Sequence, residues 1–160
     1  MLLDTQHKPF RTAVWFLLII YLLMLTKMVI FKRSPADIKD HFLHGYRWQK
    51  EKIPHANFTP FATIKLYWNS HLRATYKISN LLGNLIGFVP LGILLPLLFT
   101  RLRDAWKIML CSFALSLAFE TFQLISRLGS FDVDDLILNT LGGIIGYFLF
   151  WLLTKLTLMK

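Results

Sequence analysis

Residues 132–154 read DVDDLILNTLGGIIGYFLFWLLT, and this stretch decides the fold. Behind its aspartates, no charged residue occurs from Leu136 to Thr154. A helix needs about 20 mostly apolar residues, each rising about 1.5 Å, to cross a hydrocarbon core roughly 30 Å thick. The stretch therefore predicts a membrane-spanning helix over residues 134–156.

Three further windows are also long and apolar enough to span a membrane, and they predict helices over residues 12–31, 78–100 and 106–126. The first window qualifies because Lys27 can extend its ammonium group to an interface. Its apolar run also exceeds the core of about 7–15 residues in a cleaved signal peptide, so we expect a retained helix. The predicted fold class is an all-α membrane protein with four transmembrane helices. A tail over residues 1–11 precedes them, and a long basic loop over residues 32–77 separates the first two.

Composition narrows the class of protein. The chain has 160 residues, of which 55% are apolar or aromatic and 17% charged, with a formal net charge of +9. Such a hydrophobic chain is not disordered, and a single cysteine, Cys111, excludes an internal disulfide. The positive charges flank the apolar windows and match no nucleic-acid-binding motif. We expect no cofactor, and we expect no metal site despite the pair His41 and His44, because histidines are common in loops.

Charge placement predicts the orientation of the helices. Basic residues flank the termini and the turn after the second window, at Arg11, Arg101 and Lys155, whereas the turn before the fourth helix is acidic at Asp132. Cytoplasmic flanks are enriched in lysine and arginine. We therefore expect a multi-pass protein of the cell membrane with both termini in the cytoplasm and the Asp132 turn outside.

This orientation makes the long loop external, although it carries nine basic residues against three acidic ones. Long segments follow the charge rule poorly. The loop is either a solvated surface or a surface that rests on anionic lipid headgroups. Aromatic residues from Phe58 to Trp68 predict an interfacial segment within it, and Ser34-Pro35 predicts a short helix up to Glu51.

Polar side chains inside the apolar helices require an explanation. An ionisable group near a helix centre costs about 2.5–3.5 kcal/mol on insertion scales. By helical rise, Asn84 and Glu120 lie about 7 Å below the outer edge, and Asn139 lies about 6 Å beyond Asp135. We therefore predict one polar pocket, open to the external side. The candidate ligand-binding residues are Asn84, Glu120, Gln123, Arg127, Asp132, Asp135 and Asn139.

Structural roles compete with this prediction. Asp132 and Asp135 could cap the fourth helix, and the asparagines could be hydrogen-bonded contacts between helices. Glu120 is the hardest of these residues to explain by structure alone. Glycines at Gly83-x-x-x-Gly87 and Gly142-x-x-x-Gly146 predict close helix contacts. Pro90 and Pro96 are expected to interrupt the second helix, with a kink at Pro90.

The sequence resembles the VanZ-like membrane proteins, a family named for a teicoplanin-resistance protein, over about residues 57–150. The resembling pieces include Asn57-x-x-Pro60-Phe61, Asn84-x-x-x-Phe88-x-Pro90-x-Gly92, Glu120-x-x-Gln123 with Arg127, Asp132-x-x-Asp135, and Asn139-Thr140-x-Gly142-Gly143-x-x-Gly146-Tyr147. Among these, Asn57, Pro60, Phe61, Pro90, Gly92, Gly142 and Gly146 are expected to be structural. The resemblance implies a bacterial cell-envelope protein linked to reduced susceptibility to lipoglycopeptides such as teicoplanin, and it implies no particular reaction.

Two functions remain open. In the first, which we favour, the pocket binds a lipid-linked cell-wall precursor or the drug in the outer leaflet without catalysis, and membrane lipids are the partners. In the second, an intramembrane enzyme acts on a lipid headgroup through Glu120, Asp132 and Asp135. The catalytic motifs that we considered, Gly-x-Ser-x-Gly and His-Glu-x-x-His, are absent from the sequence. A transporter is a more distant possibility, for which a homo-oligomer would supply further helices.

Overall fold

The computed structural model describes residues 8–30, 56–69, 74–126 and 129–158. Its elements over these ranges are helices. They are α1 (Lys8–Ile30), α3 (Ala62–Asn69), α4 (Ala74–Gly87), α5 (Val89–Leu98), the short 3-10 helix η2 (Thr100–Leu102), α6 (Ala105–Ser126) and α7 (Val133–Leu158). The helix predicted from residue 35 to 51, the pair His41 and His44, and Arg127 lie outside the described residues.

Four segments are long and apolar enough to cross a membrane: Lys8–Met28, Asn80–Leu98, Ala105–Ser126 and Val133–Thr157. The predicted fold class, all-α with four spanning helices, is confirmed. Two helices begin a full helical turn earlier than predicted. The first starts at Lys8, inside the predicted tail, and α4 starts at Ala74, inside the predicted loop.

The second span is interrupted at Phe88, where α4 ends and α5 begins. Pro90 lies in the first turn of α5, and a proline has no N–H to bond the carbonyl four residues earlier. The interruption predicted at Pro90 is therefore present. The prediction for Pro96 was wrong, because α5 continues past this residue to Leu98 and buries it. Prolines are tolerated in membrane helices where the surrounding packing compensates for the lost backbone bond.

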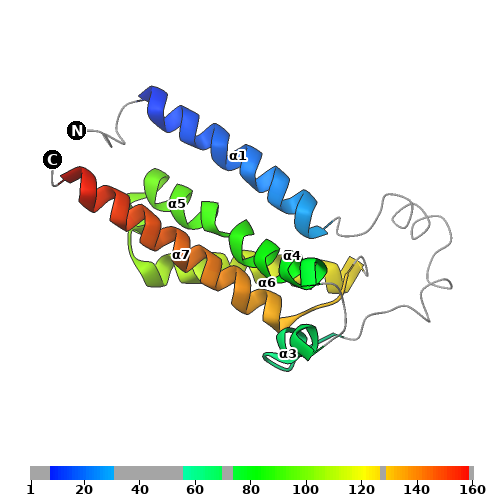
Figure 1. Ribbon diagram of the computed structural model, residues 1–160. Helices are drawn as coiled ribbons and strands as arrows, with labels where there is room; N and C mark the ends of the chain where they lie inside the picture. The colour runs from blue at the N-terminus through cyan, green and yellow to red at the C-terminus, as the bar shows by residue number, and fades with distance from the viewer. Residues whose placement is uncertain (1–7, 31–55, 70–73, 127–128, 159–160) are drawn as a thin grey trace.

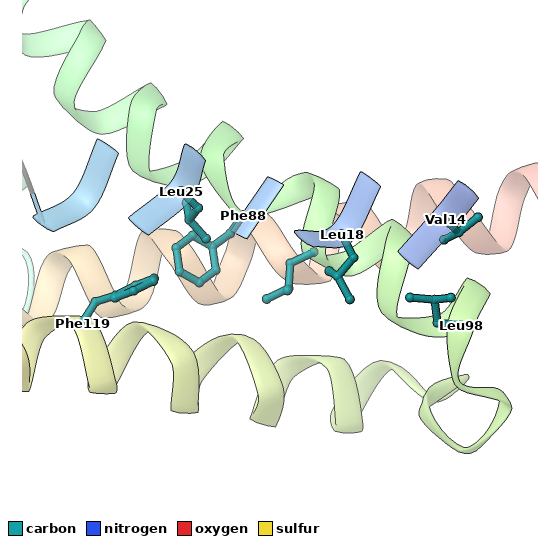
Figure 2. Packing of buried hydrophobic residues seen from close by; sticks show 7 residues of the cluster. Val14, Leu18, Leu25, Phe88, Leu98 and Phe119 are labelled. Atoms are coloured by element: carbon teal, nitrogen blue, oxygen red, sulfur yellow. The ribbon is translucent and has the colours of Figure 1, made fainter. Parts of the chain in front are cut away.

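The fourth span lies at the centre of the bundle. Helix α7 packs against α4, α5 and α6, while α1 lies on the outside against α5 and α6 (Figure 1). A buried stripe of α1, formed by Val14, Leu18 and Leu25, faces Phe88 of the α4–α5 junction and Phe119 of α6 (Figure 2). The apolar core thus holds α1 to the second and third spans.

Glycines allow the backbones of α4, α5 and α7 to approach one another. A methyl group on Gly142 would lie 2.0 Å from the carbonyl oxygen of Leu85, and one on Gly92 would lie 2.0 Å from that of Gly143. Gly146 faces the carbonyl of Val89 in the same way. The contact predicted for Gly142 and Gly146 is present. The prediction for Gly83 was wrong, because no neighbouring atom lies within 4 Å of the position where its Cβ would be.

The helix ends fall into two groups. The beginning of α1, the η2 turn and the end of α7 lie at one end of the bundle, and α3 lies with the beginning of α7 at the other (Figure 1). The predicted topology, with both termini and the turn after the second span on one side of the membrane, requires this grouping of the helix ends. Which end faces the cell exterior stays a prediction.

Candidate functional site

The start of α7 is joined to a segment far away in the sequence. The Asn57 N–H donates to the carbonyl oxygen of Phe131 at 2.8 Å, and the Val133 N–H donates to the carbonyl oxygen of Asn57 at 3.1 Å. These bonds form an isolated parallel bridge between Asn57 and Asp132. The Phe58 and Phe131 rings stack beside it, with centroids 5.1 Å apart. Backbone pairing thus fixes the chain before α3 against α7.

The Asp132 carboxylate strengthens this junction. Its Oδ1 accepts hydrogen bonds from the Asn57 side-chain amide and from the Asp134 N–H, both at 2.9 Å. Its Oδ2 accepts from the Thr63 hydroxyl at 2.6 Å. The bond to Asp134 is the N-cap interaction that satisfies a free N–H group in the first turn of a helix. Asp132 therefore caps α7 and binds the α3 segment at the same time.

The neighbouring Asp134 side chain caps the beginning of α3, as the Asp132 side chain caps the beginning of α7. The Asp134 side chain is fully buried, and its two oxygens accept from the N–H groups of Phe61 at 2.5 Å and Ile64 at 3.0 Å. Phe61 has a φ of 63°, a left-handed conformation that is uncommon for a residue with a large side chain. The Asp134 carboxylate holds Phe61 in that conformation, which accounts for the Pro60-Phe61 turn ahead of α3.

Glu120 connects α6 to the same junction. Its carboxylate is buried, with 1% of the residue exposed, and its Oε2 accepts from the Asp132 N–H at 2.8 Å. A carboxylate at this point also faces the positive end of the α7 dipole. The Glu120 carboxylate is thus held by the Asp132 N–H, directly before α7.

Amide side chains join the remaining helices. Asn84 of α4 donates to the Asp135 carboxylate of α7, and Asn139 of α7 donates to the Ser116 hydroxyl of α6 at 2.8 Å. Asn84 is 6% exposed and Asn139 is 2% exposed. Gln123 is buried near Gly129, where an added methyl group would lie 2.9 Å from its Cδ.

We call this group the polar cluster; its members are Asn84, Glu120, Gln123, Asp132, Asp134, Asp135 and Asn139. The structure gathers six of the seven predicted ligand-binding residues at one end of the bundle, and the seventh, Arg127, lies outside the described residues. Asn84, Glu120, Asp132 and Asn139 each form a hydrogen bond with a residue of another segment. The capping role considered for Asp132 and the interhelical role considered for the asparagines are both present in the structure.

Sequence reasoning missed several members of this network. Asp134 was noted in the acidic turn but was not selected, and Thr63, Ser112 and Ser116 were not considered as site residues. One signal was available for the two serines, because they precede Glu120 at helical spacing on the same face of α6. Both are fully buried, and within the described residues the Ser112 hydroxyl and the Asn139 side-chain carbonyl have no hydrogen-bond partner.

Four apolar spans around a buried cluster of carboxylates and amides define a multi-pass membrane protein. A family model described as VanZ/LLP1 matches residues 16–154, so the chain belongs to this family. Protein VanZ of Enterococcus faecium is 31% identical over 139 residues, which cover 87% of this chain and 74% of that relative. No solved structure matches the chain. The family match begins in α1, earlier than the region 57–150 that carried the resemblance.

Proposed function

We propose that this VanZ-family membrane protein lowers susceptibility to lipoglycopeptides such as teicoplanin in the bacterial cell envelope. The proposed mechanism is non-catalytic: the polar cluster and its surroundings bind a lipid-linked cell-wall precursor or the drug in the outer leaflet. One observation carries the proposal, namely that α4, α6 and α7 bring buried carboxylates and amides together at one end of the bundle. Polar groups in a membrane are costly and most often serve a function.

The aromatic residues beside the cluster support a lipid-linked ligand. Phe58, Phe61 and Trp68 are exposed, with 86% of Trp68 accessible, and all belong to the α3 segment that Asp132 and Asp134 hold. Tryptophan rings are enriched at the level of lipid headgroups, and phenylalanines accompany them on the apolar face of interfacial segments. The same end of the protein thus presents rings to a lipid surface and fixes them through buried carboxylates.

The hydrogen bonds of Asp132 and Glu120 count against a role for these two carboxylates in proton transfer. Asp132 accepts from three donors, and Glu120 accepts from a main-chain N–H. A general acid or base must exchange a proton with a substrate held within hydrogen-bond reach, whereas these oxygens are already engaged in joining helices. The alternative, an enzyme that uses Glu120, Asp132 and Asp135, would require this junction to open.

Teicoplanin susceptibility in a sensitive host tests the proposal. We expect wild-type protein to raise the inhibitory concentration and Glu120→Gln to lose most of that gain, because the amide keeps an acceptor for the Asp132 N–H but removes the charge. Asp104→Asn, at the opposite end of the bundle, is the matched control and should behave as wild type. Expression level is measured for each variant by immunoblotting.

Two results would contradict the proposal. If wild-type expression leaves susceptibility unchanged, this chain has no such role. The second result is a lipid-linked precursor that accumulates in a deletion strain. If the wild-type protein removes this precursor and the Glu120→Gln variant does not remove it, the catalytic alternative replaces the binding mechanism.

A further inference from the structure

An apolar groove runs along the outside of the bundle between α1 and the α4–α5 junction, beside the contacts that join them. Its volume is about 700 Å³, and its walls include Leu17, Met24 and Met28 of α1 and Pro90 and Ile93 of α5. The Tyr21 hydroxyl also lies in the wall, but it already donates to the carbonyl oxygen of Gly87 at 2.8 Å. The groove therefore presents hydrocarbon to whatever occupies it.

The interruption of the second span contributes to this groove. At the break, Gly87 and Pro90 form part of the wall that faces α1, and both residues have little side-chain volume. Meanwhile, the stripe through Val14 and Leu18 keeps α1 in contact with the rest of the bundle (Figure 2). The two helical segments are thus held in contact along one edge of the groove.

The position of the groove identifies the kind of molecule that fills it. It lies between two spanning segments, Lys8–Met28 and Asn80–Leu98, so it faces lipid. From Leu17 to Met28 it extends roughly 16 Å at the rise of an α-helix. One leaflet contributes roughly half of the 30 Å hydrocarbon core. A single acyl chain of one leaflet therefore matches the groove in length, and its methylene groups would gain dispersion contacts with the apolar walls.

A charge lies in the helical turn where this groove ends, outside the groove wall. Lys27, which is exposed, precedes the groove residue Met28 in the last turn of α1. Met28 packs against Gly87, where an added methyl group would lie 2.9 Å from the Met28 Cε. Gly87 follows the polar-cluster residue Asn84 by about one helical turn. We propose that the groove binds one acyl chain of an anionic phospholipid from the leaflet beside the polar cluster, with the lipid phosphate near Lys27. This proposal goes beyond the proposed function and stands whether or not the cluster binds a wall precursor.

Photocrosslinking tests the proposal directly. The full chain is placed in nanodiscs that contain phosphatidylglycerol with a diazirine in one acyl chain, and the crosslinked residues are mapped by mass spectrometry. We expect crosslinks to concentrate on groove residues such as Met24 and Ile93 rather than on Phe16 and Leu23, which are exposed but do not line the groove. Ile93→Trp, which fills the groove, should abolish most groove crosslinks, and Leu23→Trp is the matched control.

A second variant and a second lipid complete the test. Met24→Trp fills the groove from the α1 side and replaces Ile93→Trp if that variant does not fold. Lys27→Gln should remove a preference for phosphatidylglycerol over phosphatidylcholine of about fivefold, the factor expected for one lysine at an anionic membrane surface. Uniform crosslinking around α1, unchanged by either tryptophan, would overturn the acyl-chain site. Equal labelling by both lipids in wild type would overturn the role of Lys27.

Discussion

At the residue scale, Asp134 shows how one buried carboxylate determines a conformation elsewhere in the chain. It belongs to the first turn of α7, yet both of its oxygens accept backbone N–H groups at the start of α3. Those N–H groups have no partner within α3, because the first turn of a helix lacks acceptors for them. The position of α3, and with it the exposed aromatic segment, therefore depends on a residue far along the sequence.

Replacing this carboxylate is expected to release α3. Asp134→Ala leaves the Phe61 and Ile64 N–H groups without an acceptor and should lower the free energy of unfolding by about 1–3 kcal/mol. Unfolding in mixed micelles, followed by circular dichroism, measures this change, and limited proteolysis within residues 62–69 reports the release of α3. Asp104→Ala is the control. Asp104 pairs with Lys107 at 2.5 Å on an exposed surface, and such pairs contribute only about 0–1 kcal/mol. The role given to Asp134 would be refuted if Asp134→Ala and Asp104→Ala lowered the free energy of unfolding equally and Asp134→Ala left the proteolysis of residues 62–69 unchanged.

At the element scale, the approach of α5 to α7 depends on missing side chains. Gly92 meets the backbone of α7 at Gly143 and Gly146, so that any Cβ would strike main-chain atoms, which cannot rotate away. Contact between membrane helices relies on van der Waals packing of small residues, since lipid offers no hydrophobic driving force. Nearer the polar cluster, Gly142 allows the same close approach between α7 and α4, which are also joined by the bond from Asn84 to Asp135.

A comparison of substitutions at Gly92 and Gly83 separates the effect of helix packing from that of helix propensity. Gly92→Ala should force α5 away from α7 and lower the free energy of unfolding by about 1–3 kcal/mol, the usual range for overpacking. Gly83→Ala places a methyl group where no atom lies within 4 Å, and it should be neutral or slightly stabilising because alanine favours the helix. The same unfolding measurement in micelles compares the two variants. Equal destabilisation by both would show that Gly92 is not a packing contact.

At the scale of the whole molecule, the two ends of the bundle differ in chemistry. The end with the α5–α6 turn carries Arg103, which donates to the carbonyl oxygen of Pro96 at 3.2 Å, and Lys107, which lies 5.7 Å from the centre of the Trp106 ring. The other end carries the polar cluster. Since basic flanks favour the cytoplasm, the polar cluster is predicted to face the exterior.

Cysteine labelling checks this orientation. In a Cys111→Ala background, Thr59→Cys should react with a membrane-impermeant maleimide added to intact cells, whereas Arg101→Cys should react only after permeabilisation. Both positions are exposed in the structure, so that a difference between them reports the side of the membrane. The reverse pattern would place the polar cluster in the cytoplasm and would rule out binding in the outer leaflet.

That the polar residues of three spans lie near one end of the bundle could be predicted because helix geometry is regular. The structure buries Asn84, Glu120 and Asn139, but Asn84 bonds Asp135, about one helical turn before Asn139, so the two asparagines do not share one level. Their partners could not be predicted in this way. The bonds from Thr63 and Phe61 to aspartates of α7 join segments about 70 residues apart, and the sequence contains no periodic signal for such a pairing.

The amino-acid sequence by itself determined the number of spans, the break at Pro90, the family and the residues that membrane burial makes costly. These properties follow from local hydropathy, from the missing N–H of proline and from motif spacing, each of which acts within one segment. Only the tertiary structure decided that Asp134 holds α3, that Gly92 rather than Gly83 contacts a neighbouring helix, and that a groove runs between α1 and α5 beside their contact. Those outcomes depend on how separate helices rotate and approach one another, which is set by packing between side chains distant in the sequence.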